Sequence, residues 1–345
     1  MGEQTGGDDL TDVTVSVVVP MRNEAKDIGA CLAGFEAQTW PLDRLDLVVV
    51  DGASDDGSRR IVEDLTATRP WIRIVDNPAL RASAAFNRGI AATTGEVVCL
   101  FSSHGVPDPD YLANSVETLR RSRAAGVGGP IRIDGWDPRS RAVGLALASP
   151  FGMASPFRYS TTVTEVDTIG HPAYLRSTVD AVGPFDESLE RNSDYEYNWR
   201  IRAQGMRLVF DSAIGSSYAP RPGIAALARQ FWAYGRWKAE VVRRHPASVR
   251  PRQLVPPAFV AWLLLTPVLL LQRPTRRLLL LSLGLYAAGV AGSVLHARRT
   301  DPRHPVDLAA LVAAFPTMHL SWGAGFLVSL LAPPAPTPGP DRPTD

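Results

Sequence analysis

Polar side chains follow four predicted β-strands at the points where those strands end. These groups are Arg22-Asn23-Glu24, Asp51, Asp76-Asn77 and Ser102-Ser103-His104. In open α/β sheets, ligands bind in a crevice beyond the carboxyl ends of the strands, so the four groups are expected to line one site. Carboxylates, hydroxyls and an imidazole in that place can accept hydrogen bonds from a ligand or contribute to a metal site.

The segment VVCLFSSHGVPDPDYL (97–112) raises the question of a metal most directly. A strand, a short polar loop and a Pro-flanked turn are predicted there, and the site is open to three interpretations: altered metal ligands, no metal, or no site at all. One imidazole (His104) with one hydroxyl (Ser102) suits Mn²⁺ better than Mg²⁺, which prefers carboxylate and water oxygens. Asp108 and Asp110 lie past the turn and are expected to be turn and N-cap residues.

Buried strands alternating with helices must position these groups. Uninterrupted apolar runs predict strands, and apolar residues at helical spacing predict the segments between them. The predicted strands begin at residues 13, 45, 72 and 96, and the helices between them cover 23–38, 59–69 and 82–93. This alternation predicts an α/β fold with a mainly parallel sheet and helices on both faces.

The C-terminal third contains three apolar stretches, at 255–271, 278–295 and 306–331. A membrane-spanning helix needs about 20 apolar residues, so the second and third stretches qualify. The first is short and contains prolines, which favours a kinked or re-entrant segment. We expect about three membrane helices over 254–331, after a catalytic domain and before a disordered tail at 332–345.

Charge and cysteine usage narrow the possible functions. The 345 residues carry a formal net charge of +1, which gives no electrostatic reason to expect a nucleic-acid partner. Arginines gather instead around the apolar stretches, and those in the segment RRHPASVRPRQ (243–253) favour a cytoplasmic N-terminal domain. Arginines between the apolar stretches leave the topology open. Cys31 and Cys99 are predicted to be reduced core residues, since no secretory signal peptide precedes them.

The motifs VSVVVPMRNEAKDI, LVVVDGASDDGS, RASAAFNRGIAATTGEVVCLF and NSDYEYNWRIRAQG resemble those of family 2 glycosyltransferases in order and spacing. The C-terminal part resembles the membrane-anchored bacterial branch typified by succinoglycan-biosynthesis transferases, so the resemblance covers residues 13 to about 331. It implies a GT-A fold over 13–225, an amphipathic interfacial segment over 226–253, and a loose tail at 1–12. It also implies a nucleotide-diphosphate-sugar donor and inversion at the anomeric carbon.

The resemblance assigns donor binding to one set of residues. They are Pro20, Arg22, Glu24, Asp51, Arg81, Ser102, Ser103, Arg236 and Trp237. Asp51 would accept the uracil imide hydrogen, and Arg81 would meet the diphosphate or the uracil. Arg236 and Trp237, with Lys238, would close over the leaving diphosphate. The same segment also fits an interfacial helix with aromatic side chains at the level of the lipid headgroups.

The resemblance assigns catalysis to Asp194, as the general base that takes the proton of the acceptor hydroxyl. Glu196 and His171 would lie on the acceptor side. The two acids of the family's Asp-x-Asp pattern correspond to Ser102 and His104 here. His104 is therefore the metal-ligand candidate, and a divalent cation (Mn²⁺ or Mg²⁺) is in doubt because both acids are replaced.

The expected function is a single sugar transfer from a UDP-sugar to a lipid-linked or polysaccharide acceptor. The protein would be multi-pass in the cell membrane with a cytoplasmic catalytic domain, in contact with lipids and with other polysaccharide-assembly proteins. A non-catalytic membrane scaffold with the same fold is the alternative, motivated by the altered metal loop. A dinucleotide-dependent oxidoreductase is excluded, because PMRNE replaces the G-x-G-x-x-G motif after the first strand.

Overall fold

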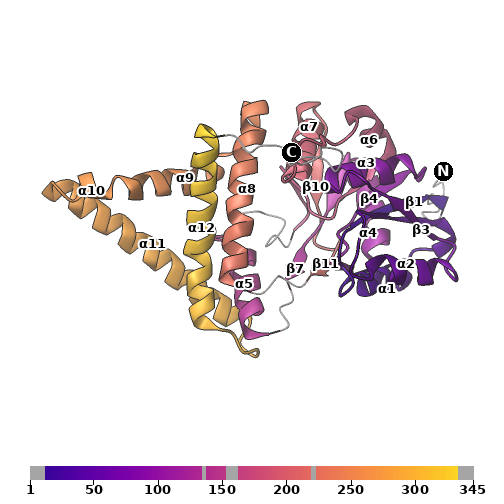
Figure 1. Cartoon of the computed structure of the whole chain (residues 1–345), viewed down its shortest axis with the longest axis horizontal. Helices are drawn as coiled ribbons and strands as arrows, with labels where there is room; N and C mark the ends of the chain where they lie inside the picture. The colour runs from indigo at the N-terminus through magenta and orange to yellow at the C-terminus, as the bar shows by residue number, and fades with distance from the viewer. Residues whose placement is uncertain (1–11, 134–136, 153–161, 219–222, 333–345) are drawn as a thin grey trace, which may run out of the picture.

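The protein consists of a sheet-based part followed by a layer of long helices, as Figure 1 shows. The computed structural model describes residues 12–133, 137–152, 162–218 and 223–332. The two predicted tails, at 1–12 and 332–345, lie outside these ranges except for Asp12 and Ala332.

The sheet-based part contains an eight-stranded sheet in the order β3-β2-β1-β4-β9-β6-β10-β8 and a three-stranded sheet in the order β5-β11-β7. Neighbours from β3 to β4 are parallel, whereas β9 runs antiparallel to β4 and β6, and β8 runs antiparallel to β10. The strands are β1 (Val15–Met21), β2 (Leu45–Asp51), β3 (Ile72–Asp76), β4 (Val97–Leu100), β5 (Gly105–Pro107), β6 (Gly126–Gly128), β7 (Ile131–Ile133), β8 (Thr164–Val166), β9 (Ala173–Leu175), β10 (Leu208–Phe210) and β11 (Ser216–Tyr218).

The helices cover the large sheet first and then build the C-terminal layer. They are α1 (Ile28–Glu36), α2 (Ser58–Thr66), α3 (Ala82–Ala91), α4 (Tyr111–Ser122), α5 (Pro138–Ala148), α6 (Arg176–Val182), α7 (Ser193–Ala203), α8 (Ile224–Arg244), α9 (Pro251–Leu264), α10 (Thr266–Leu269), α11 (Arg273–Thr300) and α12 (Leu308–Leu331). Two short 3₁₀ turns, Leu42–Arg44 and Pro246–Ser248, connect some of them.

The central strands are apolar along their whole length because both of their faces are buried. In β1, Val17 and Val19 face one hydrophobic core while Val18 faces the other, and β2 divides its residues in the same way. Pro20 is tolerated near the end of β1 because β4 pairs with this strand only as far as Val18. The prediction of a mainly parallel sheet with helices on both faces is confirmed.

The position of helix α5 differs from what the sequence predicted. The catalytic domain was expected to end before the helical layer begins. Its buried side chains, among them Ala142 and Leu147, join a core with Leu311 and Phe315 of α12. The backbone N–H of Asp307 also donates to the carbonyl of Pro138 at the start of α5. A segment from the middle of the sequence is therefore part of the C-terminal layer.

Helices α8 and α12 run side by side in Figure 1 and approach each other closely. A Cβ atom on Gly235 would lie 2.0 Å from the carbonyl oxygen of Trp322, and one on Gly325 would lie 2.4 Å from that of Trp232. Only glycine permits this backbone approach, because any side chain at either position would push the two helices apart.

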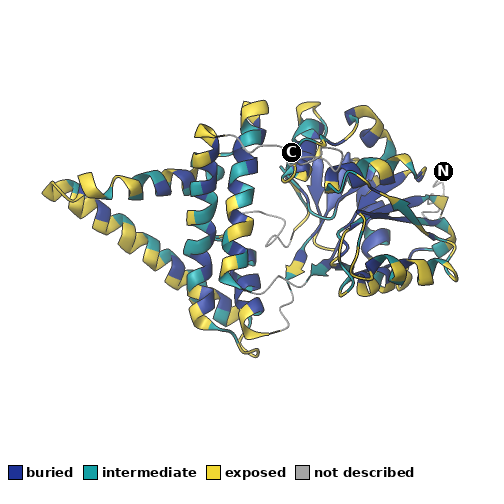
Figure 2. Ribbon diagram, in the orientation of Figure 1, coloured by how far each residue is buried: buried dark blue, intermediate teal, exposed yellow. Residues whose placement is uncertain are grey.

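Two helices of the described chain, α11 and α12, are long and apolar enough to cross a membrane. The first apolar stretch forms α9 and the four-residue α10, with the break just before Pro267, so it is too short to span. The expectation of about three spanning helices is thus reduced to two candidates. Figure 2 shows much of α10 and α11 exposed.

Candidate active site

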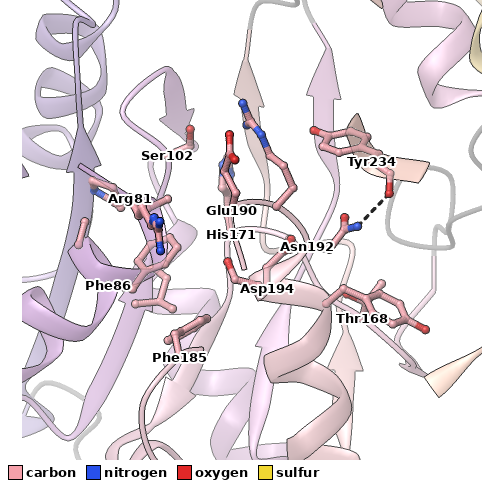
Figure 3. A pocket seen from close by; sticks show the side chains of 18 of the residues that line it. Arg81, Phe86, Ser102, Thr168, His171, Phe185, Glu190, Asn192, Asp194 and Tyr234 are labelled. Atoms are coloured by element: carbon pink, nitrogen blue, oxygen red, sulfur yellow. Dashed lines mark hydrogen bonds between the residues drawn. The ribbon is translucent and has the colours of Figure 1, made fainter. Parts of the chain in front are cut away.

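A cavity of about 870 Å³ lies between the strand ends of the large sheet and the helical layer. Residues of the loops after β1, β3 and β4 form one end, and residues of α8, α9 and α12 form the other. In Figure 3, Asp194 lies between Arg81 and Ser102 on one side and Thr168 and Tyr234 on the other. We call the end formed by the loops after β1, β3 and β4 the strand end of the cavity, and the end formed by α8, α9 and α12 the helix end.

Ser102, Ser103 and His104 line the strand end directly after β4, as predicted from the sequence. The Ser102 hydroxyl oxygen lies 3.0 Å from a ring nitrogen of His104. His104 Nδ1 also lies 3.7 Å from a carboxylate oxygen of Glu24, which comes from the loop after β1. The backbone N–H of Glu24 donates to the Ser58 hydroxyl at 2.7 Å and fixes that loop.

Glu24 and His104 therefore lie close enough to contribute together to a metal site. Within the described residues, no group of three or more His, Cys, Asp or Glu side chains is arranged to hold an ion. A cation bound through one or two protein ligands completes its shell with water and substrate phosphate oxygens. The donor set fits an ion shared with a diphosphate, and does not fit a metal held by protein alone.

Asp51 ends β2 just behind the cavity wall, where its neighbour Gly52 is a lining residue. The carboxylate is buried, accepts the Ser54 hydroxyl at 2.6 Å and contacts Arg59 Nη1 at 3.2 Å. Arg59 also pairs with Asp76 of β3 at 2.6 Å. These bonds hold Asp51 in one orientation.

Arg81 is the N-cap residue of α3 and lines the strand end together with Pro20 and Arg22. Its Nη1 donates to the carbonyl oxygen of Glu187 at 2.8 Å, which orients the guanidinium across the loop before α7. The start of α3 and this cation give the strand end a positive edge suited to a phosphate.

Asp194 lies in the first turn of α7 with its carboxylate open to the cavity. The residue is accessible from the cavity, and desolvation by the surrounding protein raises the pKa of Asp194 above its ordinary value. The nearby Lys238 charge opposes the shift. Asn192, the N-cap residue, donates to the carbonyl of Tyr234 at 3.0 Å and so ties the start of α7 to α8.

His171 lines the cavity in a left-handed backbone conformation, with φ of 42°. Its ring stacks on Phe101 with centroids 4.1 Å apart, and its Nδ1 lies 2.9 Å from the Ser216 hydroxyl. The ring is thus held from two sides, with its position set by the core beneath it.

Four predicted site residues are absent from the cavity lining: Asp51, which lies just behind the wall, and Glu196, Arg236 and Trp237. Glu196 is buried and contacts Arg200 Nε at 2.8 Å and His245 Nε2 at 3.1 Å, so it supports α7 and does not face an acceptor. Trp237 packs into a small core with Leu189, and Arg236 is likewise absent from the lining. The predicted closure of Arg236 and Trp237 over the diphosphate is not what this arrangement shows.

Sequence reasoning missed Phe231 and Tyr234 at the site, and it grouped Lys238 with Arg236 and Trp237. The residues of α8 that line the cavity are Phe231, Tyr234 and Lys238. Their spacing of three and four residues places them on one helix face, which excludes Arg236 and Trp237. Arg252 and Gln253 at the start of α9 were missed as well. The helical phase was the available signal for α8, whereas nothing in the sequence indicated that α9 would reach the same cavity.

The family model for glycosyl transferase family 2 matches residues 16–181. The succinoglycan biosynthesis protein ExoA of Rhizobium meliloti is 30% identical over 94% of this chain and 97% of its own length. A dolichyl N-acetyl-α-D-glucosaminyl phosphate 3-β-D-2,3-diacetamido-2,3-dideoxy-β-D-glucuronosyltransferase of Methanococcus voltae is 26% identical over 67% of this chain and 74% of its own.

Among solved structures, the mannosyltransferase PcManGT from Pyrobaculum calidifontis, in complex with GDP-Man and Mn²⁺, superimposes with a TM-score of 0.62. It is 22% identical and covers 95% of this chain and 91% of its own, which shows that the fold is shared. The predicted GT-A fold is confirmed. Given the full-length similarity to ExoA and the matching family model, this chain belongs to glycosyltransferase family 2, and it is a glycosyltransferase.

Proposed function

We propose that the protein transfers one sugar from a nucleotide-diphosphate sugar, a UDP-sugar, to a lipid-linked acceptor at the membrane, with inversion at the anomeric carbon. The observation that carries the proposal is the position of Asp194 inside a cavity that joins the strand ends to the helical layer. The names of the two relatives above, one in succinoglycan biosynthesis and one acting on a dolichyl-linked sugar phosphate, support this class of acceptor.

The chemistry follows from the position of Asp194. Its carboxylate takes the proton of the acceptor hydroxyl as that oxygen attacks the anomeric carbon. The bond from that carbon to the diphosphate breaks on the opposite face, and the nucleoside diphosphate leaves with the bonding electrons. A single displacement of this kind inverts the configuration and forms no covalent enzyme intermediate.

The donor would occupy the strand end. Asp51, fixed by Ser54 and Arg59, would accept a hydrogen bond from the base, while Arg81 and the start of α3 would offset the diphosphate charge. Glu24 and His104 would hold a divalent cation against the diphosphate oxygens. That cation would supply charge neutralisation for the leaving group.

The test is the Asp194→Asn variant, which keeps the shape of the side chain and removes the base. We expect transfer to fall at least about a hundredfold, in line with the usual contribution of a general base, while UDP binding is unchanged. Asp64→Asn, at an exposed position of α2, is the matched control. Transfer at the parental rate by Asp194→Asn would refute the assignment.

Calorimetric titration of UDP with and without Mn²⁺ tests the cation. Binding that strengthens with Mn²⁺, and loses this dependence in Glu24→Gln and His104→Ala, is the expected result. UDP affinity that ignores Mn²⁺ in the parental protein would show that the loop works through hydrogen bonds and Arg81 alone. The non-catalytic scaffold, the other function considered, predicts no UDP binding under either condition.

The proposal places the catalytic domain on the cytoplasmic side of the cell membrane, with α11 and α12 as the spanning helices. Their length and apolar character support this, as do the exposed leucines of α11.

A further inference from the structure

Three guanidinium groups contact Asp167 next to the helix end of the cavity, two at its carboxylate and one at its backbone carbonyl. Arg252 and Arg250 both approach the Asp167 carboxylate, the latter at 3.4 Å, and Arg202 Nε donates to the Asp167 carbonyl oxygen at 3.1 Å. Because Asp167 neutralises only one of these charges, the cluster has an excess of positive charge. Arg252 itself lines the cavity.

Lys238 adds an amine to this cluster from the face of α8. The residue is 3% exposed and lines the cavity, and within the described residues its Nζ has no hydrogen-bond partner. The Nζ atom lies 3.3 Å from the centroid of the Tyr195 ring. Leaving a buried amine without a hydrogen-bond acceptor is costly, which indicates that an acceptor arrives with a ligand.

The electrostatics around Lys238 agree with this geometry. Burial above all, then the cations Arg252, Arg202 and Arg250, lower the pKa of Lys238 to about 7, against an opposite effect of Asp167. An anion between these groups would restore the ordinary protonated state of the amine.

Helix α9 presents its N-terminus to the same place. The helix begins at Pro251, and Arg252 and Gln253 in its first turn line the cavity. Pro251 has no N–H and the backbone N–H of Gln253 donates to the Arg250 carbonyl at 2.8 Å, so this end of the helix contributes mainly the positive end of its dipole, which favours a negative group. The side chains and the helix dipole therefore favour an anion at the same place.

The position of the cluster separates it from the donor site. In Figure 3, Arg81 and Ser102, which are predicted to meet the donor, lie on one side of Asp194, and Thr168, the neighbour of Asp167 in the sequence, lies on the other. On the cluster's own side, Pro256 of α9 and Trp322 of α12 complete the cavity wall. A ligand held here would have apolar helix surface on one side and the catalytic carboxylate on the other.

We propose that Lys238, Arg252 and the N-terminus of α9 bind the phosphate of a lipid-linked acceptor and so direct its sugar toward Asp194. This inference rests on the proposed function and adds the acceptor's chemical class: a sugar joined to a lipid through phosphate. Asp167 positions Arg250 and Arg252 for this role.

The test measures binding to the full-length protein in detergent, with undecaprenyl phosphate and uncharged undecaprenol as probes. The parental protein is expected to bind the phosphate form at least tenfold more tightly. Lys238→Met and Arg252→Gln should each reduce that preference to less than threefold while UDP binding is unchanged. Arg229→Gln, at an exposed position of α8 outside the cavity, is the control.

Arg252 is partly exposed, so Arg252→Gln still tests the site if Lys238→Met fails to fold. Three results would overturn the proposal: equal binding of the two probes, an equal loss of UDP binding in the variants, or equal competition by inorganic phosphate or phosphatidylglycerol. If the phosphate preference depends on Lys238 and Arg252 but no nucleotide sugar supports transfer, the phosphate site stands and the proposed function fails. If transfer proceeds equally well to an acceptor without phosphate, the enzyme is a transferase and the phosphate site fails.

Discussion

The sheet and the C-terminal helical layer use the same residue type under opposite conditions. Leu47 of β2 is 0% exposed between strand and helices, whereas Leu281 of α11 is 60% exposed. The leucines of the sheet lie beneath its flanking helices. Many leucines of α11 lie on the surface of the protein, and Figure 2 shows much of this helix exposed. An exposed apolar surface of this extent is what the proposed membrane-spanning role of α11 requires, whereas the sheet needs no such environment.

Leucine truncation in each region gives the largest expected contrast. Leu47→Ala removes buried side-chain volume from the sheet core and should destabilise the protein by about 2–5 kcal/mol. Leu281→Ala removes the same atoms from the exposed face of α11 and should leave the thermal midpoint in detergent nearly unchanged. Thermal unfolding of both purified variants measures the difference, and equal destabilisation would show that α11 packs against protein.

Glycine substitution divides the helical layer itself. Gly235→Ala places a Cβ atom against the Trp322 carbonyl and should cost about 1–3 kcal/mol, because α8 and α12 must move apart. Gly292→Ala on α11, where nothing lies within 4 Å of the new atom, is the matched control and should be neutral or slightly stabilising. Comparable thermal midpoints for both variants would contradict the close packing of α8 on α12.

The smallest expected effect is a shift in the pH dependence of transfer. The proposed base Asp194 can take a proton only when it is ionised, and desolvation raises its pKa. The rate should therefore fall with decreasing pH at higher pH values than for an aspartate with an ordinary pKa. Lys238 lowers the pKa of Asp194, so in Lys238→Met this fall should begin at a higher pH still. The pH profiles of kcat for both proteins measure the shift. A fall that begins at a higher pH in the parental protein than in Lys238→Met would refute the coupling between Asp194 and Lys238.

The same raised pKa has a consequence for stability with a definite sign. Between the ordinary pKa of an aspartate and the raised value, the folded protein binds more protons than the unfolded chain. Asp194 therefore reduces stability as pH rises through this window. As pH rises over that range, the thermal midpoint of the parental protein should fall by more than that of Asp194→Asn.

The central sheet was predictable because its chemistry is local. Strands β1 and β2 are buried on both faces, so their uninterrupted apolar runs are visible in the sequence. Arg22, which follows β1, lines the cavity, and Asp51, which ends β2, lies just behind its wall. The positions of Ser102, His104 and Arg81 at the cavity follow from the same topology.

The helix end of the cavity was not predictable, because its residues come together through distant packing. The resemblance pointed to Arg236, Trp237 and Lys238 together, whereas the packing of α8 against α12 turns only Lys238 of these three toward the cavity. The proximity of Glu24 to His104, by contrast, follows from the parallel strands β1 and β4, whose ends lie at the same edge of the sheet.

The packing of α5 on α12 has a consequence for how the chain is made. During synthesis the ribosome releases α5 long before α12. The apolar face of α5 therefore stays exposed until α12 has been made. The ion pair between Arg141 and Asp301, 160 positions apart, can close only at that late stage. A recombinant fragment that stops at residue 225 would expose this face permanently, so soluble expression of the catalytic part alone is expected to yield aggregate.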